Sequence, residues 1–207
     1  MSFDDIDFLG DIRLIAVNGM SSSGKGTFAE RAAAELPNAA VVYGDTVVWS
    51  SVLKRPDLQK QICGRTFSSF EEFLAYYLEN ESYELLLKLE NNPYLAGDFE
   101  AEVLKAVEEN PAAAGEARYI VVEWTLLNLI ERIWKNARIT VTLKTSPDVQ
   151  RRIFLAHTKD RGDKLEALDI RNRKAQPLIR DGAYILQNEG DDSFFEEISR
   201  FCRAYGV

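Results

Sequence analysis

Short apolar runs alternate along the chain with longer segments in which apolar residues recur at helical spacing. The apolar runs predict five strands, at residues 13–17, 39–43, 119–123, 138–143 and 183–187. Helices are predicted at residues 28–36, 46–54, in several pieces between 66 and 110, from 148 toward 158, and at 193–205. Strands that alternate with helices favour a parallel sheet covered by helices on both faces. The pattern therefore predicts an α/β fold of three layers, with a central parallel sheet.

The longest helical pattern lies between residues 66 and 110. Ser69 and Glu72 are spaced as a capping box near its start. Five apolar residues then recur on one face: Phe70, Phe73, Leu74, Tyr77 and Leu78. A stripe of this kind favours a packed core face over a ligand platform. Asn91-Asn92-Pro93 interrupts the pattern before a further helix at 98–109, and residues 110–115 predict a linker.

Length and composition fit one α/β domain with an inserted piece, since 207 residues with 46% hydrophobic content can build a core. The chain has no apolar run of about 18 residues, and its acidic start lacks a secretory pattern, so we expect a cytoplasmic protein without a membrane span. Cys63 and Cys202 are expected to be reduced, and the single histidine, His157, to be structural. The net charge of −8 argues against nucleic acid as a partner.

The charge is also unevenly distributed along the chain. Residues 71–116 carry twelve acidic side chains against two basic ones, Lys88 and Lys105. Residues 148–180 carry nine basic side chains against five acidic ones. A positive segment in an acidic protein predicts a bound anion, and nucleotide phosphates are the obvious candidate.

Residues 19–27, Gly-Met-Ser-Ser-Ser-Gly-Lys-Gly-Thr, are typical of a phosphate-binding loop. An apolar strand precedes this segment and a helix-prone segment follows it, which is the context that the motif requires. Glycines let backbone N–H groups wrap a polyphosphate, and the helix N-terminus adds partial positive charge. Lys25 can then reach the outer phosphates. One position differs from the usual motif, because Gly26 stands where a hydroxyl residue is common and Thr27 follows one place later.

Four polar or glycine positions fall at the predicted carboxyl ends of strands. They are Gly19, Asp45, Glu123 and Asn188. In parallel sheets, ligands bind beyond the carboxyl ends of the strands. These positions therefore predict one active-site edge.

The chain resembles the nucleoside-monophosphate-kinase-like group of phosphate-loop (P-loop) kinases. The segment Gly24-Lys25-Gly26-Thr27 is similar to adenylate and some cytidylate kinases. The later half resembles dephospho-CoA kinase in four segments: Val141-Thr142-Leu143-Lys144, Val149-Gln150-Arg151-Arg152, Asp160-Arg161 and residues 184–190. The resemblance covers residues 12–50 and 117–205, whereas residues 55–115 match no family pattern.

The resemblance implies a single P-loop kinase domain that uses ATP and Mg²⁺. Its core would comprise residues 12–50, 116–150 and 176–207, with a helical acceptor region at 51–115 and a short lid at 151–175. ATP would be held by Gly19, Ser21, Ser22, Ser23, Gly24, Lys25, Gly26 and Thr27, together with Arg152, Arg173, Asn188 and Gly190. Thr27 and Glu123 would help to hold the metal ion. Lys25 and Arg161 would stabilise the transferring phosphoryl group, and Asp45 would orient or deprotonate an attacking hydroxyl.

Simpler structural roles remain open for several of these residues. Asp45 precedes a predicted helix and could cap it, a role compatible with catalysis. Glu123 could be an ordinary surface acid at a strand end. Each lid arginine could be a solvated helix residue paired with Asp160, Asp163 or Asp169.

The acceptor is the least determined part of this interpretation. Val48 stands where adenylate and cytidylate kinases carry an arginine for the acceptor's phosphate, and the chain lacks the His-Pro of dephospho-CoA kinase. Four cations could still bind a phosphorylated acceptor: Lys54, Arg55, Lys60 and Arg65. We expect a kinase that acts on a small molecule through a hydroxyl group. The alternatives are a nucleoside monophosphate kinase, a P-loop protein that hydrolyses nucleotide or uses it as a switch, and a catalytically silent nucleotide-binding module.

Overall fold

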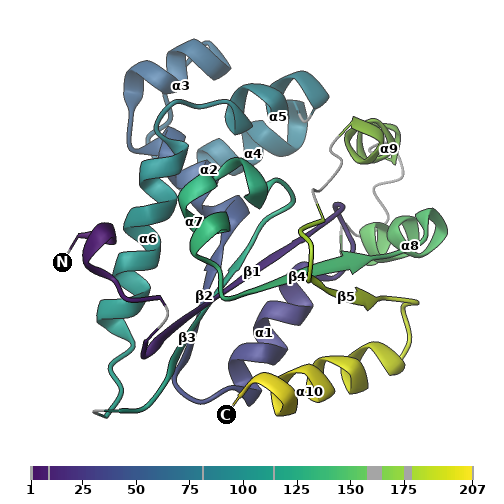
Figure 1. Ribbon diagram of the computed structural model, residues 1–207. Helices are drawn as coiled ribbons and strands as arrows, with labels where there is room; N and C mark the ends of the chain where they lie inside the picture. The colour runs from purple at the N-terminus through teal and green to yellow at the C-terminus, as the bar shows by residue number, and fades with distance from the viewer. Residues whose placement is uncertain are drawn as a thin grey trace.

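The computed structural model describes residues 2–8, 10–80, 82–113, 115–157, 165–174 and 179–206. Its centre is a five-stranded parallel sheet in the order β2-β3-β1-β4-β5 (Figure 1). The strands are β1 Ile12–Gly19, β2 Ala39–Tyr43, β3 Arg118–Glu123, β4 Ile139–Lys144 and β5 Tyr184–Gln187. All five predicted strands are confirmed, with ends shifted by one or two residues. The parallel arrangement brings their carboxyl ends to one edge.

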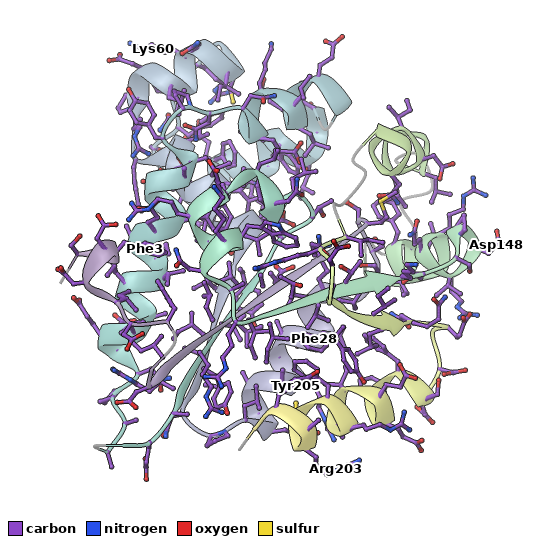
Figure 2. All side chains as sticks on the ribbon, in the orientation of Figure 1. Phe3, Phe28, Lys60, Asp148, Arg203 and Tyr205 are labelled. Carbon is purple, nitrogen blue, oxygen red and sulfur yellow. The ribbon has the colours of Figure 1, made fainter. Side chains whose placement is uncertain are left out.

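Helices cover both faces of the sheet, as the alternating sequence pattern predicts. Helices α1, Lys25–Glu35, and α10, Ser193–Tyr205, pack together on one face (Figure 1). Ile15 and Val17 of β1 point to this face and share a core cluster with Phe28 of α1 (Figure 2). Leu14 and Ala16 belong to the core cluster of the other face. This alternation along β1 produces the two buried layers.

The other face carries the inserted helices and the first residues of the chain. They are η1 Phe3–Asp5, α2 Gly44–Leu53, α3 Pro56–Cys63, α4 Phe70–Asn80, α5 Tyr83–Glu90, α6 Leu95–Glu109, η2 Leu127–Leu129 and α7 Glu131–Asn136. Helix α6 contacts both β2 and β3, and α2 packs on α6. Helices α3 and α7 were not predicted, because each is too short to show a clear helical period.

Two local predictions for α4 need correction. The backbone N–H of Glu72 donates to Ser69 Oγ at 3.2 Å, but the Glu72 carboxylate accepts from the N–H and hydroxyl of Ser68, both at 2.8 Å. In a capping box that begins at Ser69, the Glu72 carboxylate would accept from the Ser69 N–H. Here it accepts from Ser68, one residue earlier. In the apolar stripe, Phe73 and Tyr77 are buried, whereas Phe70 and Leu78 are about two-fifths exposed. The face that packs on the core is thus narrower than predicted.

The last third of the chain contains α8, Pro147–His157, and α9, Leu165–Lys174. Helix α8 begins as predicted, with the Val149 N–H donating to Ser146 Oγ at 3.3 Å. Helix α9 lies within the predicted lid and contacts α5. Arg161 and the rest of segment 158–164 lie outside the described residues, as do the side chains of His157 and Arg173.

Two expectations drawn from composition can be compared with the described residues. Both cysteines are free, as expected. Every helix in the described ranges is too short or too polar to span a lipid bilayer.

Candidate active site

The segment between β1 and α1 forms a tight loop that only glycine can build at two positions. Gly19 has φ of +154°, and Gly24, the N-cap of α1, has φ of +94°. A Cβ on Gly24 would lie 2.6 Å from Asn188 Nδ2, and one on Gly19 would lie 2.9 Å from the carbonyl oxygen of Leu143. Gly24 therefore lets the loop turn directly into α1, so that the helix N-terminus faces the loop.

Side chains from three other elements hold the loop backbone. The Ser23 carbonyl accepts hydrogen bonds from Asn188 Nδ2 at 2.9 Å and from Thr145 Oγ1 at 3.2 Å. The Ser21 N–H donates to Asn172 Oδ1 of α9 at 3.0 Å. Asn172 and Asn188 are both buried, so these bonds are shielded from water. The loop is consequently braced by residues that follow β4 and β5.

The residues that brace the loop were only partly predicted. Asn188 was assigned to the cofactor, and the structure places its amide against the loop. Thr145 directly follows β4, so the strand-end argument used for Asp45 and Asn188 could have found it. Asn172 lies within a basic helix and had no sequence signal. Its amide also donates to Gln150 Oε1 at 2.9 Å, which links α9 to α8.

Lys25 is the first residue of α1, and its ammonium group folds back over the loop. Its Nζ donates to the Met20 carbonyl at 3.0 Å, and the residue is 9% exposed. Lys25 therefore lies at the concave side of the loop, close to where phosphates would be held. It is more buried than a loop lysine normally is.

Asp45 lies beyond the carboxyl end of β2, on the first turn of α2. The N-cap of α2 is Tyr43, which makes no side-chain capping bond, so the capping alternative for Asp45 is wrong. Asp45 is exposed and makes no hydrogen bond or ion pair with any described residue. It lines a cavity of about 20 Å³ together with residues of α2, α4, α5 and the end of β3. A carboxylate at this place is available to a ligand.

Glu123 ends β3, between Val17 of β1 and Tyr43 of β2 in the sheet register. It is 8% exposed, so the alternative of an ordinary surface acid is wrong. Burial, together with the charges of Glu30 and Glu123, raises the pKa of the Tyr43 hydroxyl. The central sheet edge thus carries negative charge next to the loop.

Mg²⁺ prefers oxygen ligands and usually keeps several water molecules. Thr27, on the first turn of α1, offers a hydroxyl, and Glu123 offers a carboxylate at the same sheet edge. These two donors fit a magnesium ion whose other ligands are water and phosphate oxygens. A Cβ on Gly26 would meet nothing within 4 Å, so the usual hydroxyl position is open.

Three residues predicted to bind the cofactor, Arg152, Asn188 and Gly190, lie close together at the turn that follows β5. Arg152 Nη2 donates to the Glu189 carbonyl at 3.1 Å, and the Gly190 N–H donates to Asn188 Oδ1 at 2.8 Å. Arg152 is therefore not paired with an acidic residue in the described part of the lid. The neighbouring Arg151 is paired with an acidic residue, because its Nη2 lies 2.6 Å from Asp169 Oδ2.

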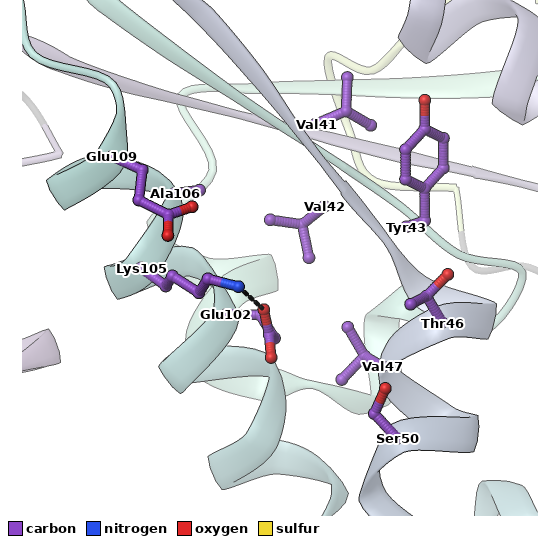
Figure 3. A pocket seen from close by; sticks show the side chains of 10 residues that line it. All are labelled: Val41, Val42, Tyr43, Thr46, Val47, Ser50, Glu102, Lys105, Ala106 and Glu109. Atoms are coloured by element: carbon purple, nitrogen blue, oxygen red, sulfur yellow. Dashed lines mark ion pairs between the residues drawn. The ribbon is translucent and has the colours of Figure 1, made fainter. Parts of the chain in front are cut away.

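A cavity of about 510 Å³ opens beside the loop, between α8 and α9. Its lining comprises Met20, Thr145, Pro147, Gln150, Arg151, Asp169 and Asn172. A second pocket, of about 300 Å³, lies between β2, α2 and α6 and has an ion pair between Lys105 and Glu102 on its rim (Figure 3). No residue of the loop lines this second pocket, whereas the larger cavity has the size of a ligand site and adjoins the loop.

The parallel sheet, the loop after β1 and the helices on both faces define a three-layer α/β fold of the P-loop type, so the predicted fold is confirmed. One similar solved structure is TT1252 from Thermus thermophilus, with a TM-score of 0.62 and 17% identity over 93% of this chain and 96% of that one. Dephospho-CoA kinase from Campylobacter jejuni has a TM-score of 0.50 and 14% identity over 94% of this chain and 98% of that one. No protein-family model and no curated protein sequence matches the chain. At these identities the likeness shows the fold.

Proposed function

We propose that this protein is an ATP-dependent kinase that phosphorylates a hydroxyl group of a small molecule. The observation that carries the proposal is the carboxylate of Asp45. It is exposed, has no partner among the described side chains and lies at the same sheet edge as the loop. A carboxylate so placed can accept a proton from an attacking hydroxyl.

In the proposed reaction the hydroxyl oxygen of the acceptor attacks the γ-phosphorus of ATP. A new P–O bond forms while the bond from the γ-phosphorus to the β,γ-bridging oxygen breaks. The hydroxyl proton passes to Asp45 and then to water, so that ADP and a phosphate monoester are released. Phosphoryl transfer depends mainly on positioning and on neutralisation of charge. The loop N–H groups and Lys25 would supply that neutralisation.

The remaining residues have supporting roles in this proposal. Thr27 and Glu123 would hold a magnesium ion, directly or through its water, and the ion would supply positive charge against the phosphates. The cavity beside the loop would receive the rest of the nucleotide. Arg152, Asn188 and Gly190 remain proposed nucleotide-binding residues, although they do not line that cavity. Arg161 and Arg173 remain proposed lid residues. Helices between residues 51 and 115 would bind the acceptor.

The surroundings of Asp45 favour a hydroxyl over a phosphate acceptor. Val48, at the position of the phosphate-binding arginine of adenylate and cytidylate kinases, is 4% exposed and packs in the core. Arg55 is held by Asp98 through two hydrogen bonds, of 2.7 and 2.9 Å. This arginine of the helical region is thus already paired with a carboxylate.

A labelled-ATP transfer screen with the Asp45→Asn variant tests this function. The screen compares hydroxyl compounds, such as nucleosides and dephospho-CoA, with the four common nucleoside monophosphates. We expect transfer to a hydroxyl compound and a loss of about 10²–10⁴-fold in kcat for Asp45→Asn, with ATP affinity unchanged. Efficient turnover of monophosphates alone would favour a nucleoside monophosphate kinase. Hydrolysis without any acceptor would favour the switch alternative, and ATP binding without transfer or hydrolysis would favour the silent module.

A further inference from the structure

The cavity next to Asp45 has a wall of aromatic residues. Asp45 and Trp49 are four residues apart on α2 and therefore lie on one side of that helix. Trp49 is partly exposed, and its ring centroid lies 5.7 Å from that of Tyr77 on α4. Both rings line the cavity with Asp45. A carboxylate and a flat apolar surface are thus presented side by side.

The lining of the same cavity adds one more aromatic residue and a second carboxylate. Trp124, directly after β3, is 1% exposed, and its indole N–H is buried without a partner among the described atoms. Glu90, the last residue of α5, lines the same cavity. The cavity holds about 20 Å³, which is room for one water-sized group such as a hydroxyl. A hydroxyl can both donate to a carboxylate and accept from an indole N–H.

Three cations of the helical region are already paired with acidic residues. Arg55 pairs with Asp98, Lys54 Nζ lies 3.5 Å from Glu102, and Arg65 pairs with Glu72. The Arg55 guanidinium also lies 4.3 Å above the ring of Tyr94.

Lys60, the fourth candidate, is exposed on α3 at the outer end of the helical region (Figure 2). None of these four cations lines the cavity, whereas two acidic residues, Asp45 and Glu90, do. A phosphate carried by the acceptor would therefore meet the exposed carboxylate of Asp45, with no cation among the described lining residues to offset it.

We propose that the acceptor is a ring-bearing alcohol that carries no phosphate or carboxylate, such as a nucleoside. This inference rests on the proposed function and names its substrate class. The ring lies on Trp49 at the mouth of the cavity, and the attacking hydroxyl enters the cavity and reaches Asp45. Stacking on Trp49 supplies affinity, and the carboxylates exclude phosphorylated analogues.

Matched acceptors test the substrate class. Adenosine and cytidine are each compared with their 5′-monophosphates, and glycerol serves as an alcohol without a ring. We expect kcat/KM to be at least about tenfold higher for each nucleoside than for its monophosphate, because like charges disfavour the latter. Glycerol should react at least about tenfold less well than the nucleosides, since it cannot stack. Higher kcat/KM for the monophosphates would overturn the inference while leaving the kinase function intact, and equal kcat/KM for glycerol would overturn the role of the ring.

Tryptophan fluorescence measures binding without depending on transfer. Nucleosides should quench the emission saturably, and Trp49→Leu should weaken their binding by about tenfold, the range expected for one lost stacking contact. The matched control is Trp134→Phe, a buried tryptophan on α7 outside the cavity, which should leave nucleoside affinity unchanged. Saturable quenching that Trp49→Leu weakens, but no transfer to any acceptor, would refute the kinase function and support the ring site. Absence of quenching by any nucleoside, or equal affinity in Trp49→Leu, would refute the ring site.

Discussion

The two halves of the candidate site are held together by different interactions. In the nucleotide half, polar side chains from distant segments bond to loop backbone atoms, as Thr145, Asn172 and Asn188 do. In the acceptor half, aromatic packing around Trp49 and Tyr77 and the pair of Arg55 with Asp98 connect the helices. The nucleotide half is therefore held through backbone atoms of the loop, and the acceptor half is held through packing and pairing of side chains.

This difference has a consequence for function. A loop that binds phosphate through its backbone depends on few side chains, so its chemistry is fixed by glycines and one lysine. A cavity lined by side chains changes its ligand whenever its lining changes. The nucleotide half should therefore keep the same ligand unless its glycines or lysine change, and the acceptor half should determine which compound is phosphorylated. The predictions below test that division.

Within the nucleotide half, the largest effect is expected for Lys25→Ala. Loss of one preorganised donor to the transferring phosphoryl group should lower kcat by about 10²–10³-fold. The matched control is Lys54→Ala in the acceptor half, because Lys54 is exposed and its charge is already paired with Glu102. Steady-state kinetics measure both variants. Equal losses in the two lysine variants would show that the effect is one of net charge.

A smaller effect, on stability, is expected for Asp98→Asn in the acceptor half. The variant leaves the partly buried Arg55 without its carboxylate partner and should lower the free energy of unfolding by about 2 kcal/mol. Urea unfolding measures the loss, and Glu131→Gln, which breaks the exposed pair with Lys135, is the control that should change little. A loss no larger than that of the control would contradict the structural role given to Asp98.

The pH dependence of that loss follows from the pKa of Asp98. Burial raises this pKa, but hydrogen bonds from Arg55 and Ser51 and the charges of Arg55 and Lys54 outweigh it, so the pKa lies below its ordinary value. The ionised carboxylate therefore stabilises the fold above the ordinary carboxyl pKa of about 3.9, and this contribution is lost as the pH falls through the lowered pKa. The difference between wild type and variant should persist from neutral pH down to about pH 5 and shrink in stronger acid.

Asn172→Ala should weaken ATP binding by an intermediate amount and leave the acceptor half unchanged. It removes the bond to the Ser21 N–H and the link to Gln150, so KM for ATP should rise by about tenfold. Because Asn172 only positions the loop, kcat should change much less than KM. The conservative variant Asn172→Asp retains the acceptor oxygen for Ser21 but places a negative charge beside the triphosphate. A fall in kcat with KM unchanged would contradict a positioning role.

The smallest effect is expected for Gly26→Ser on the first turn of α1. The position is open to a side chain, and serine is about 0.5 kcal/mol more favourable than glycine within a helix. Thermal unfolding should show a slightly higher midpoint, and Mg²⁺-dependent transfer should be retained because the hydroxyl takes its usual place in the motif. A clear loss of stability would contradict the open position seen in the structure.

The difference between the nucleotide half and the acceptor half also explains which features could be predicted from the sequence. The loop, the strands and their carboxyl-end residues follow local rules of spacing and periodicity, and Gly19, Gly24 and Asn188 lie together as expected. The contact of Asn172 with Ser21 joins residues far apart in the sequence and follows no pattern. In the acceptor half, periodicity predicted the burial of Phe73 and Tyr77, but the burial of Val48 and the pairing of Arg55 with Asp98 depend on how the helices pack together.

Hydrogen exchange on addition of ATP and Mg²⁺ tests the division between the halves most directly. The structure predicts slower exchange in peptides covering residues 19–27, where phosphates would bind, and 165–174, which contain Asn172. It predicts unchanged exchange for residues 44–90, which would respond only to the acceptor. Equal protection of residues 44–90 by ATP alone would contradict the assignment of the two halves to different ligands.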